Sequence, residues 1–202
     1  MGATRTRLAG AVDELLVSTS PFLVEHCRRS FALALLFAEA GNVRVDVEVL
    51  YAGVLLHDLG LTTQYHSDQI RFEVASANTA RDLVRVHGMS PARADNVWDV
   101  AALHATDGIS DAKSPETAIG SSGIASDVTG LGLDGLPAKR IAQIMTTRPG
   151  FARPFIDAIV TDLRDKPEVA SSTWMTTIAA DHIPGFRQYS VEQFALADPF
   201  EL

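Results

Sequence analysis

An apolar run at residues 49–56, VLYAGVLL, places the strongest constraint on how this chain can fold. A helix that is apolar on every side is a buried helix, so we expect this segment to lie inside the protein. His57 and Asp58 follow it directly, and Gly60 lies where a left-handed C-cap is expected. The run therefore predicts a buried helix that carries an imidazole and a carboxylate at its end.

The pair His57-Asp58 is costly to bury without a compensating charge. An unpaired carboxylate in apolar surroundings carries a penalty of several kcal/mol at least. A metal cation would compensate both groups, and the alternative is a core histidine that is hydrogen-bonded to a capping aspartate. Three further ligand-type residues favour the metal: His26 and His104 lie in other apolar helices, and Asp127 lies in a later helical stretch.

The rest of the chain shows the 3.6-residue period of amphipathic helices, with no sustained alternation of period two. Caps and prolines predict helices at about residues 6–16, 21–41, 46–58, 72–87, 90–104, 115–128, 137–147, 154–165 and 168–181. We expect the helix at 115–128 to be interrupted or kinked near 120–123, and the tail from 183 to be irregular and to pack on the surface. Loops at 59–70 and 107–111 would lie near the site. One all-α domain, a helical bundle of residues 1–202, is the predicted fold.

The composition points to a small-molecule partner. A chain of 202 residues with 47% hydrophobic content can bury a full core in one domain. Its 17 basic and 25 acidic residues give a net charge of −8, which argues against a nucleic acid or an anionic membrane as partner. A homo-oligomer is left open. Cys27 is the single cysteine, and neither a signal peptide nor a membrane-spanning stretch is evident, so we expect a soluble cytoplasmic protein.

The ligand-type residues favour hydrolysis or hydration. Imidazoles and carboxylates suit zinc, iron, manganese or similar divalent ions. Four protein ligands leave positions open for water and substrate, as in catalytic sites, and a bound ion lowers the pKa of water from about 15.7 to roughly 7–9. Arg29 shares a helix face with His26 and would orient a carboxylate or hold an anionic substrate, unless it forms an ordinary salt bridge. Cys27 points elsewhere and is interpreted as a small buried hydrophobe.

His26, the pair His57-Asp58 and the distal Asp127 resemble the H…HD…D signature of the HD-domain superfamily, an all-helical family of metal-dependent phosphohydrolases. The resemblance runs from about residue 22 to 187 and extends to the cyanamide hydratase-like branch. The segments that carry it are Glu25-His26-Cys27, residues 55–62 (LLHDLGLT), residues 71–74 (RFEV), Val97-Trp98, residues 102–104 (ALH), residues 130–134 (GLGLD) and residues 182–186 (HIPGF).

This resemblance implies one divalent metal ion at His26, His57, Asp58 and Asp127, with zinc as the first choice and iron, manganese or nickel as alternatives. It also implies that Glu73, His104 and Thr106 line the pocket, where His104 or Glu73 would shuttle a proton. The branch leads us to expect Asp-Gly after the Phe-Glu-Val segment, but this chain has Ala75-Ser76. The chain thus lacks a carboxylate at this point.

Several functions compete at this stage. The first is a hydratase or hydrolase that adds metal-activated water to a small nitrile- or cyanamide-like substrate, with Asp58 and Arg29 among the catalytic residues. The second is a phosphohydrolase of a nucleotide or another phosphomonoester. A non-catalytic ligand-binding domain and a two-iron oxygenase are further alternatives. Four apolar residues are expected to close around the metal: Leu61, Tyr65, Phe72 and Ile109. The remaining histidines are interpreted as surface or structural residues: His66, His87 and His182.

Overall fold

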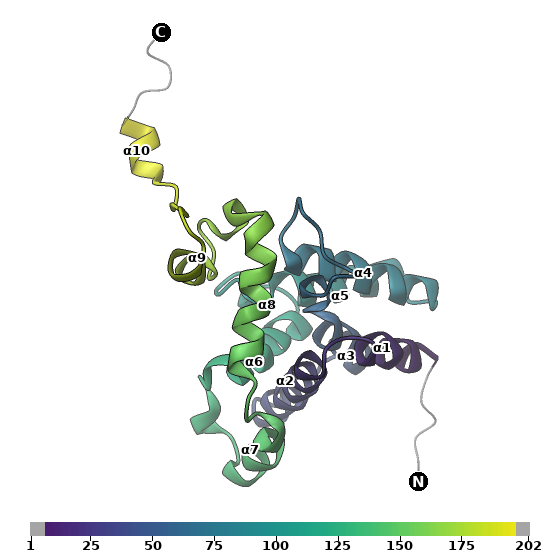
Figure 1. The fold of residues 1–202 in the computed structure, drawn as a ribbon. Coiled ribbons are helices and arrows are strands. Elements are labelled where there is room, and N and C mark those ends of the chain that lie inside the picture. The colour runs from purple at the N-terminus through teal and green to yellow at the C-terminus, as the bar shows by residue number, and fades with distance from the viewer. Residues whose placement is uncertain (1–6, 197–202) are drawn as a thin grey trace, which may run out of the picture.

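The computed structural model describes residues 7–196, and within this range the chain consists of helices and connecting turns without strands (Figure 1). This confirms the predicted all-α fold. The α-helices are α1 (Arg7–Val17), α2 (Pro21–Ala40), α3 (Val47–Leu56), α4 (Phe72–Val86), α5 (Pro91–Leu103), α6 (Pro115–Thr129), α7 (Ala138–Ile144), α8 (Ala152–Asp165), α9 (Thr176–His182) and α10 (Val191–Leu196). Short 3-10 turns lie between them: η1 (Leu59–Leu61), η2 (Ser110–Ala112), η3 (Leu133–Gly135), η4 (Met145–Thr147) and η5 (Pro167–Ala170).

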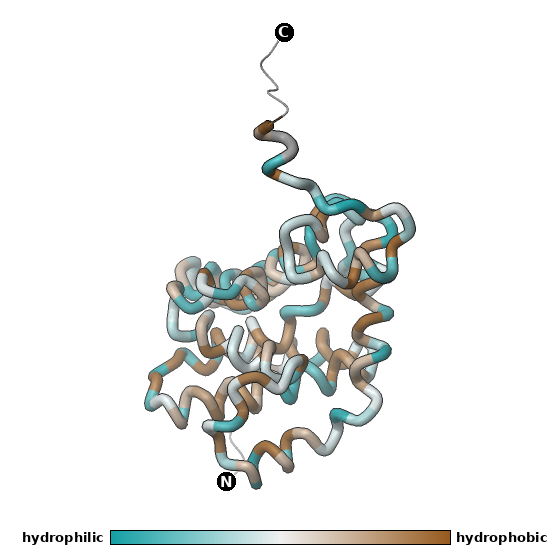
Figure 2. Tube along the Cα trace, turned by 90° about the vertical axis from the view of Figure 1, so that its left-hand side faces the viewer, coloured by the Kyte–Doolittle hydropathy of each residue, from teal (hydrophilic) through white to brown (hydrophobic). Residues whose placement is uncertain are grey.

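Helix α3 lies inside the bundle, as its apolar sequence predicts. It contacts α1, α2, α4, α5 and α6, and Leu50, Val54 and Leu56 are fully buried. Asp46 begins the helix as its N-cap and accepts hydrogen bonds from the backbone N–H groups of Glu48 and Val49. Figure 2 shows hydrophobic and hydrophilic stretches alternating along the chain, as expected for helices with one face turned to a core.

Helix α6 runs without interruption from Pro115 to Thr129, so the predicted kink at residues 120–123 is wrong. The glycines there serve close packing. A Cβ added to Gly123 would lie 2.4 Å from the carbonyl oxygen of Ser30 in α2, and one added to Gly120 would lie 3.0 Å from Val100 in α5. Because these two residues lack side chains, α6 can lie against α2 and α5 at short range.

Helix α8 and the turns that follow it form a second apolar cluster, in front of the bundle in the view of Figure 1. Its fully buried members include Ile159 and Leu163 on α8, Met175 before α9 and Phe72 at the start of α4. Since Phe72 belongs to the bundle by sequence, this cluster joins α8 to the loop that follows the His57-Asp58 pair.

A buried lysine fixes that loop. Lys166 has no exposed surface, and its Nζ donates to the carbonyl oxygens of Ser67 (2.6 Å) and Ile70 (2.7 Å) and pairs with Asp162 (2.9 Å). His66 also pairs with Asp162, at 3.0 Å. The segment between η1 and α4 is thereby held against α8, in keeping with a structural role for His66.

Two other segments differ from the predictions. Residues 168–181 do not form one helix, because Ser172 has a positive φ of 60° and separates η5 from α9. The tail from residue 183 is not wholly irregular, since it includes α10, which projects away from the other helices in both views (Figures 1 and 2). Within residues 7–196, no helix is both long enough and apolar enough to cross a membrane.

Candidate metal centre

His57 and Asp58 lie at the buried end of α3 with electron pairs turned toward the same space. Nδ1 of His57 donates a hydrogen bond to the carbonyl oxygen of Val54 (2.7 Å), which leaves a lone pair on Nε2 of the neutral ring. Asp58 is 2% exposed. Its Oδ2 has no hydrogen-bond partner among the described residues. A buried carboxylate oxygen without a hydrogen bond is costly, so this atom needs a positive charge beside it, either a proton on a neighbouring histidine or a metal ion.

His26 adds a third donor from the middle of α2. Its Nε2 lies 3.2 Å from Nε2 of His57 and 3.4 Å from Oδ2 of Asp58, and Nε2 of His57 lies 3.3 Å from the same oxygen. Within the described part of the chain, these three residues are the one group of ligand-type side chains whose atoms all lie within 4.8 Å of one another. Two nitrogen lone pairs and a carboxylate oxygen thus converge, as the donor set of a divalent transition metal does.

The charges of these groups fit a cation site. Burial opposes protonation of His57, but the Asp58 carboxylate outweighs it and raises the pKa of His57 well above the ordinary value. Burial likewise opposes ionisation of Asp58, yet His57 keeps the pKa of Asp58 below its usual range. Burial lowers the pKa of His26, which keeps that ring neutral. A proton on His57 and a metal ion would compensate the same carboxylate, so the two compete.

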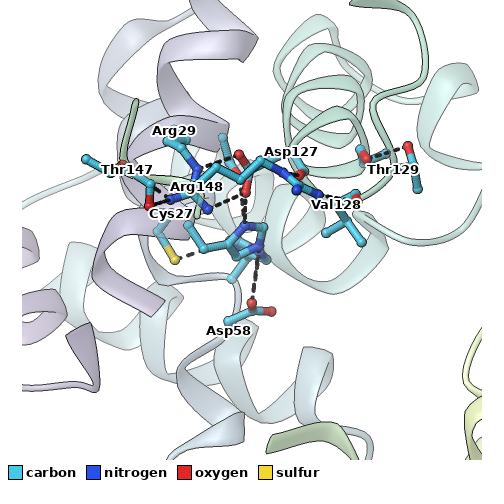
Figure 3. Close-up of polar contacts among 12 residues, drawn as sticks. Cys27, Arg29, Asp58, Asp127, Val128, Thr129, Thr147 and Arg148 are labelled. Carbon is cyan, nitrogen blue, oxygen red and sulfur yellow. Dashed lines mark hydrogen bonds and ion pairs between the residues drawn. The ribbon is translucent and has the colours of Figure 1, made fainter. Parts of the chain in front are cut away.

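Asp127 reaches this group through His26. Its Oδ2 accepts a hydrogen bond from Nδ1 of His26 (2.7 Å), on the side of the ring opposite Asp58 (Figure 3). Arg29 donates to both carboxylate oxygens, from Nε at 2.7 Å and from Nη2 at 2.8 Å, and its Nη1 donates to the carbonyl of Thr147. Burial raises the pKa of Asp127, but the bonds from His26 and Arg29 outweigh it and lower that pKa overall. A hydrogen-bonded carboxylate of this kind fixes the tautomer and direction of a ligating histidine.

The structure therefore brings together three of the four predicted ligands, and places the fourth one ring away. Direct coordination by Asp127 stays a prediction, since its oxygens are occupied by His26 and Arg29. Of the two interpretations of Arg29, the buried salt bridge is the one the structure contains.

His104 approaches the group from the end of α5. Its ring centroid lies 4.7 Å from that of His57. Nδ1 donates to the carbonyl of Ala101 (2.7 Å), while Nε2 makes no hydrogen bond to any residue between 7 and 196. Burial lowers the pKa of His104 to about 4. The ring is therefore neutral near pH 7 and presents a lone pair that could accept a proton or bind a metal.

Glu73 and Thr106 do not line the cavity at the cluster. Glu73 is fully buried, paired with Arg71, and accepts a hydrogen bond from Nε1 of Trp174 (3.2 Å). The hydroxyl of Thr106 donates to the carbonyl of Leu103 (2.7 Å) and so closes the turn after α5. Glu73 affects the cavity indirectly, because it holds Trp174, which lines the cavity.

Ser76, one of the two residues that stand where Asp-Gly was expected, has a structural role. Ser76 is fully buried; its hydroxyl donates to the carbonyl of Phe72 and accepts from the backbone N–H of Gly60, both at 2.8 Å. Gly60 does not have the positive φ predicted for it. It is needed because a Cβ there would lie 2.3 Å from the carbonyl oxygen of Phe72. Together, Ser76 and Gly60 hold η1 against α4.

Cys27 is buried beside the cluster, with Sγ 3.8 Å from Nδ1 of His57. Burial raises the pKa of this thiol. A thiol that stays protonated near neutrality is a weak ligand and nucleophile, in keeping with its interpretation as a small buried hydrophobe.

A cavity of about 230 Å³ opens at the cluster. Its lining includes the three ligand-type residues and His104, and most of the remaining lining is apolar. No lysine or arginine lines it, and Asp58 and Asp107 are its two acidic residues. The lining residues are His26, His57, Asp58, His104, Ala105, Asp107, Ile124, Ala125, Val128, Thr129, Leu131, Phe155 and Trp174. Asp107 confirms that the loop at 107–111 reaches this cavity.

The apolar walls are not the ones predicted from the sequence. Leu61, Tyr65, Phe72 and Ile109 do not line the cavity. Phe72 packs in the second cluster, and Ile109 is 59% exposed.

Aromatic residues from the C-terminal part of the chain cover the cluster instead. Phe151 stacks on His26 with ring centroids 4.9 Å apart, Phe155 lies 5.5 Å from the same ring, and Trp174 lines the cavity. The available signal was the spacing of Phe151, the N-cap of α8, and Phe155 in its first turn, four residues apart. Nothing local in the sequence indicated which helix these two rings would meet.

Comparison with known proteins gives one match. Residues 23–145, more than half of the chain, match the model of the HD domain family. The search of curated proteins found no relative. The matched segment includes His26, His57, Asp58 and Asp127, and it ends before Phe151, Phe155 and Trp174. This chain belongs to the HD domain family.

Proposed function

We propose that this protein is a metal-dependent hydrolase or hydratase that adds activated water to a small uncharged substrate, such as a nitrile or a cyanamide-like molecule. The observation that carries the proposal is the convergence of two imidazole nitrogens and a buried carboxylate oxygen, which has no hydrogen-bond partner among the described residues, beside a cavity that no lysine or arginine lines. Membership of the HD domain family supports the metal-dependent, hydrolase-type part of it.

His26, His57 and Asp58 would hold one divalent ion, with zinc as the first candidate. Such an ion lowers the pKa of bound water from about 15.7 to roughly 7 and so supplies a nucleophile near neutral pH. Asp127, clamped by Arg29, would keep Nε2 of His26 aimed at the ion. The hydrogen bond to Val54 would do the same for His57.

His104 is the best placed of the described residues to move a proton. Its Nε2 makes no hydrogen bond to any of the described residues, and the ring lines the cavity. With a pKa of about 4, it is neutral at pH 7 and would accept a proton from the attacking water and return it to the atom that gains negative charge. Addition to a nitrile needs this transfer, because the carbon gains oxygen while the nitrogen gains hydrogen.

The cations of this region support an uncharged substrate over a phosphomonoester. Recognition of phosphate usually uses several charged or amide donors. Here Arg29 is bound to Asp127 and Thr147, Arg71 is bound to Glu73, and Arg148 donates to the carbonyl oxygens of Asp127 and Val128 (Figure 3). None of the three lines the cavity. A phosphate group in the cavity would therefore contact no lysine or arginine, and the metal would be its main positively charged partner.

The test compares reactions on protein loaded with a single defined metal. Zinc, manganese and iron forms are prepared from chelator-treated protein, and initial rates are measured on cyanamide, small nitriles and a panel of phosphomonoesters. We expect hydration of the uncharged substrates, abolished in His57→Ala and retained in His87→Ala, whose histidine is exposed. Phosphate release by the wild type with no hydration of any nitrile would overturn the proposal in favour of a phosphohydrolase.

A further inference from the structure

We infer that the substrate carries an apolar body, of about the size of a phenyl ring, beside its reacting group, and that Phe155 and Trp174 form the surface that selects it. This inference rests on the proposed function for the reacting group only. It assigns a specificity role to two residues that lie outside the family match, which ends at residue 145.

The volume of the cavity is the first argument. A water molecule takes about 30 Å³ of liquid, so 230 Å³ has room for about eight groups of that size. A reacting group of three heavy atoms, such as cyanamide, leaves more than half of this space unfilled. Water in the remainder would find few partners, because ordered buried water needs two to four polar contacts. An apolar substituent fills the same space without that need.

The chemistry of the walls is the second argument. Apart from the ligand-type residues, most of the lining is apolar: Ile124 and Val128 on α6, Leu131 in the turn after it, Phe155 on α8 and Trp174 before α9. Asp58 and Asp107 are acidic, and no lysine or arginine lines the cavity. An anionic substituent would therefore be repelled by these two carboxylates. An uncharged apolar group is complementary to these walls.

The rigidity of the two aromatic walls is the third argument. Trp174 donates from Nε1 to Glu73, which is itself paired with Arg71, and its ring meets Phe72 edge-on at a centroid distance of 6.3 Å. Phe155 lies 5.0 Å from Phe151 and 5.5 Å from His26. Both rings are therefore held in place before any ligand binds, and a preorganised wall selects by shape.

The expected selectivity follows from apolar burial. Each methylene group removed from water strengthens binding by about fourfold. A phenyl group that contacts the apolar lining should therefore improve affinity by about tenfold to a hundredfold over a one-carbon substituent. A carboxylate or phosphate on the same ring should remove that gain.

Binding can be measured without turnover. The chain has two tryptophans, and Trp98 lies on α5 outside the cavity, bonded to Asn78. In a Trp98→Phe variant, Trp174 is the single tryptophan and reports on the cavity by its fluorescence. Metal-free and zinc-loaded protein are titrated with benzonitrile, acetonitrile, cyanamide and benzoate. We expect benzonitrile to bind at least tenfold more tightly than the other three in both forms.

Two substitutions test the wall itself, with affinities read by calorimetry. Phe155→Leu keeps an apolar side chain and so protects the fold, and Trp174→Phe keeps an aromatic one. Each should weaken benzonitrile at least threefold and leave cyanamide unchanged, while Leu196→Ala on α10 should change neither. Equal affinity for benzonitrile and acetonitrile, tighter binding of benzoate, or unchanged benzonitrile affinity in both wall variants would overturn the inference. Selective binding of benzonitrile without hydration of any substrate would instead count against the proposed reaction and leave this inference standing.

Discussion

Replacement of Arg29 by methionine should destabilise the protein strongly at neutral pH and less in acid. Arg29 is 3% exposed and makes two hydrogen bonds of 2.7 and 2.8 Å to Asp127, which is fully buried. Methionine keeps much of the apolar volume but leaves the carboxylate with His26 as its remaining side-chain partner. Removal of one member of a buried ion pair costs about 3–5 kcal/mol, because the other charge stays in the interior.

The pH dependence follows from the pKa of Asp127. His26 and Arg29 lower this pKa in the folded protein, so their contribution to stability is fully present above the unfolded pKa of about 3.9 and is lost as the pH falls through the folded value. In Arg29→Met the folded pKa rises, and protonation then relieves the unpaired charge. The difference in stability between wild type and variant should therefore shrink between pH 7 and pH 4.

The assay is urea unfolding of metal-free protein at pH 7, 5.5 and 4, with ΔG from linear extrapolation. Arg153→Met is the matched control. Arg153 is 80% exposed and pairs with Asp157, which is 58% exposed, so its loss should change stability by less than about 0.5 kcal/mol. Arg29→Met combined with Asp127→Leu should recover part of the loss, because the unpaired carboxylate of residue 127 is then removed as well. A single-variant effect below about 1 kcal/mol, or one that does not vary with pH, would refute this reasoning.

Three further predictions concern the metal centre and the packing. Asp127→Asn should still bind one ion per chain but with about 10–100-fold lower affinity in a competitive chelator titration, because the tautomer of His26 is no longer fixed; unchanged affinity would contradict this role. His104→Gln should keep the metal, measured by elemental analysis, and lower kcat by about 10²–10⁴-fold; a residual rate above a tenth of wild type would show that another group moves the proton. Gly123→Ala should lower the free energy of unfolding by roughly 1–3 kcal/mol, because its Cβ would lie 2.4 Å from the carbonyl oxygen of Ser30. Gly10→Ala in α1, where nothing lies within 4 Å of the added Cβ, should raise it by about 0.5–1 kcal/mol. Similar effects for both variants would argue against close packing of α2 and α6.

Local sequence was sufficient to predict most of the helices and the nucleus of the site. The period of the apolar residues and the caps at Asp46 and Ser114 determine where α3 and α6 begin. His57 and Asp58 were identifiable because two polar groups directly after an apolar helix need a compensating charge. These signals act over a few residues and survive in a single sequence.

The remaining features depend on contacts between distant segments. Gly60 and Gly123 look like helix breakers, but their role is to admit the backbones of Phe72 and Ser30. The walls of the cavity were misplaced for the same reason, since Phe155 and Trp174 reach the cluster only through the packing of α8 against α2 and η1. The position of Asp127 beside Arg29, about a hundred residues away in sequence, is likewise a product of tertiary packing.

The account depends on one divalent ion held by His26, His57 and Asp58, and a metal titration tests this directly. Chelator-treated wild type, His57→Ala and His87→Ala are titrated with zinc in parallel, with the bound ion measured by elemental analysis after gel filtration. Because the Asp58 carboxylate raises the pKa of His57, a proton must leave as the ion binds, and affinity should increase with pH up to that pKa. We expect one ion per chain in the wild type and in His87→Ala, and none retained in His57→Ala. Full occupancy of His57→Ala would contradict the assignment.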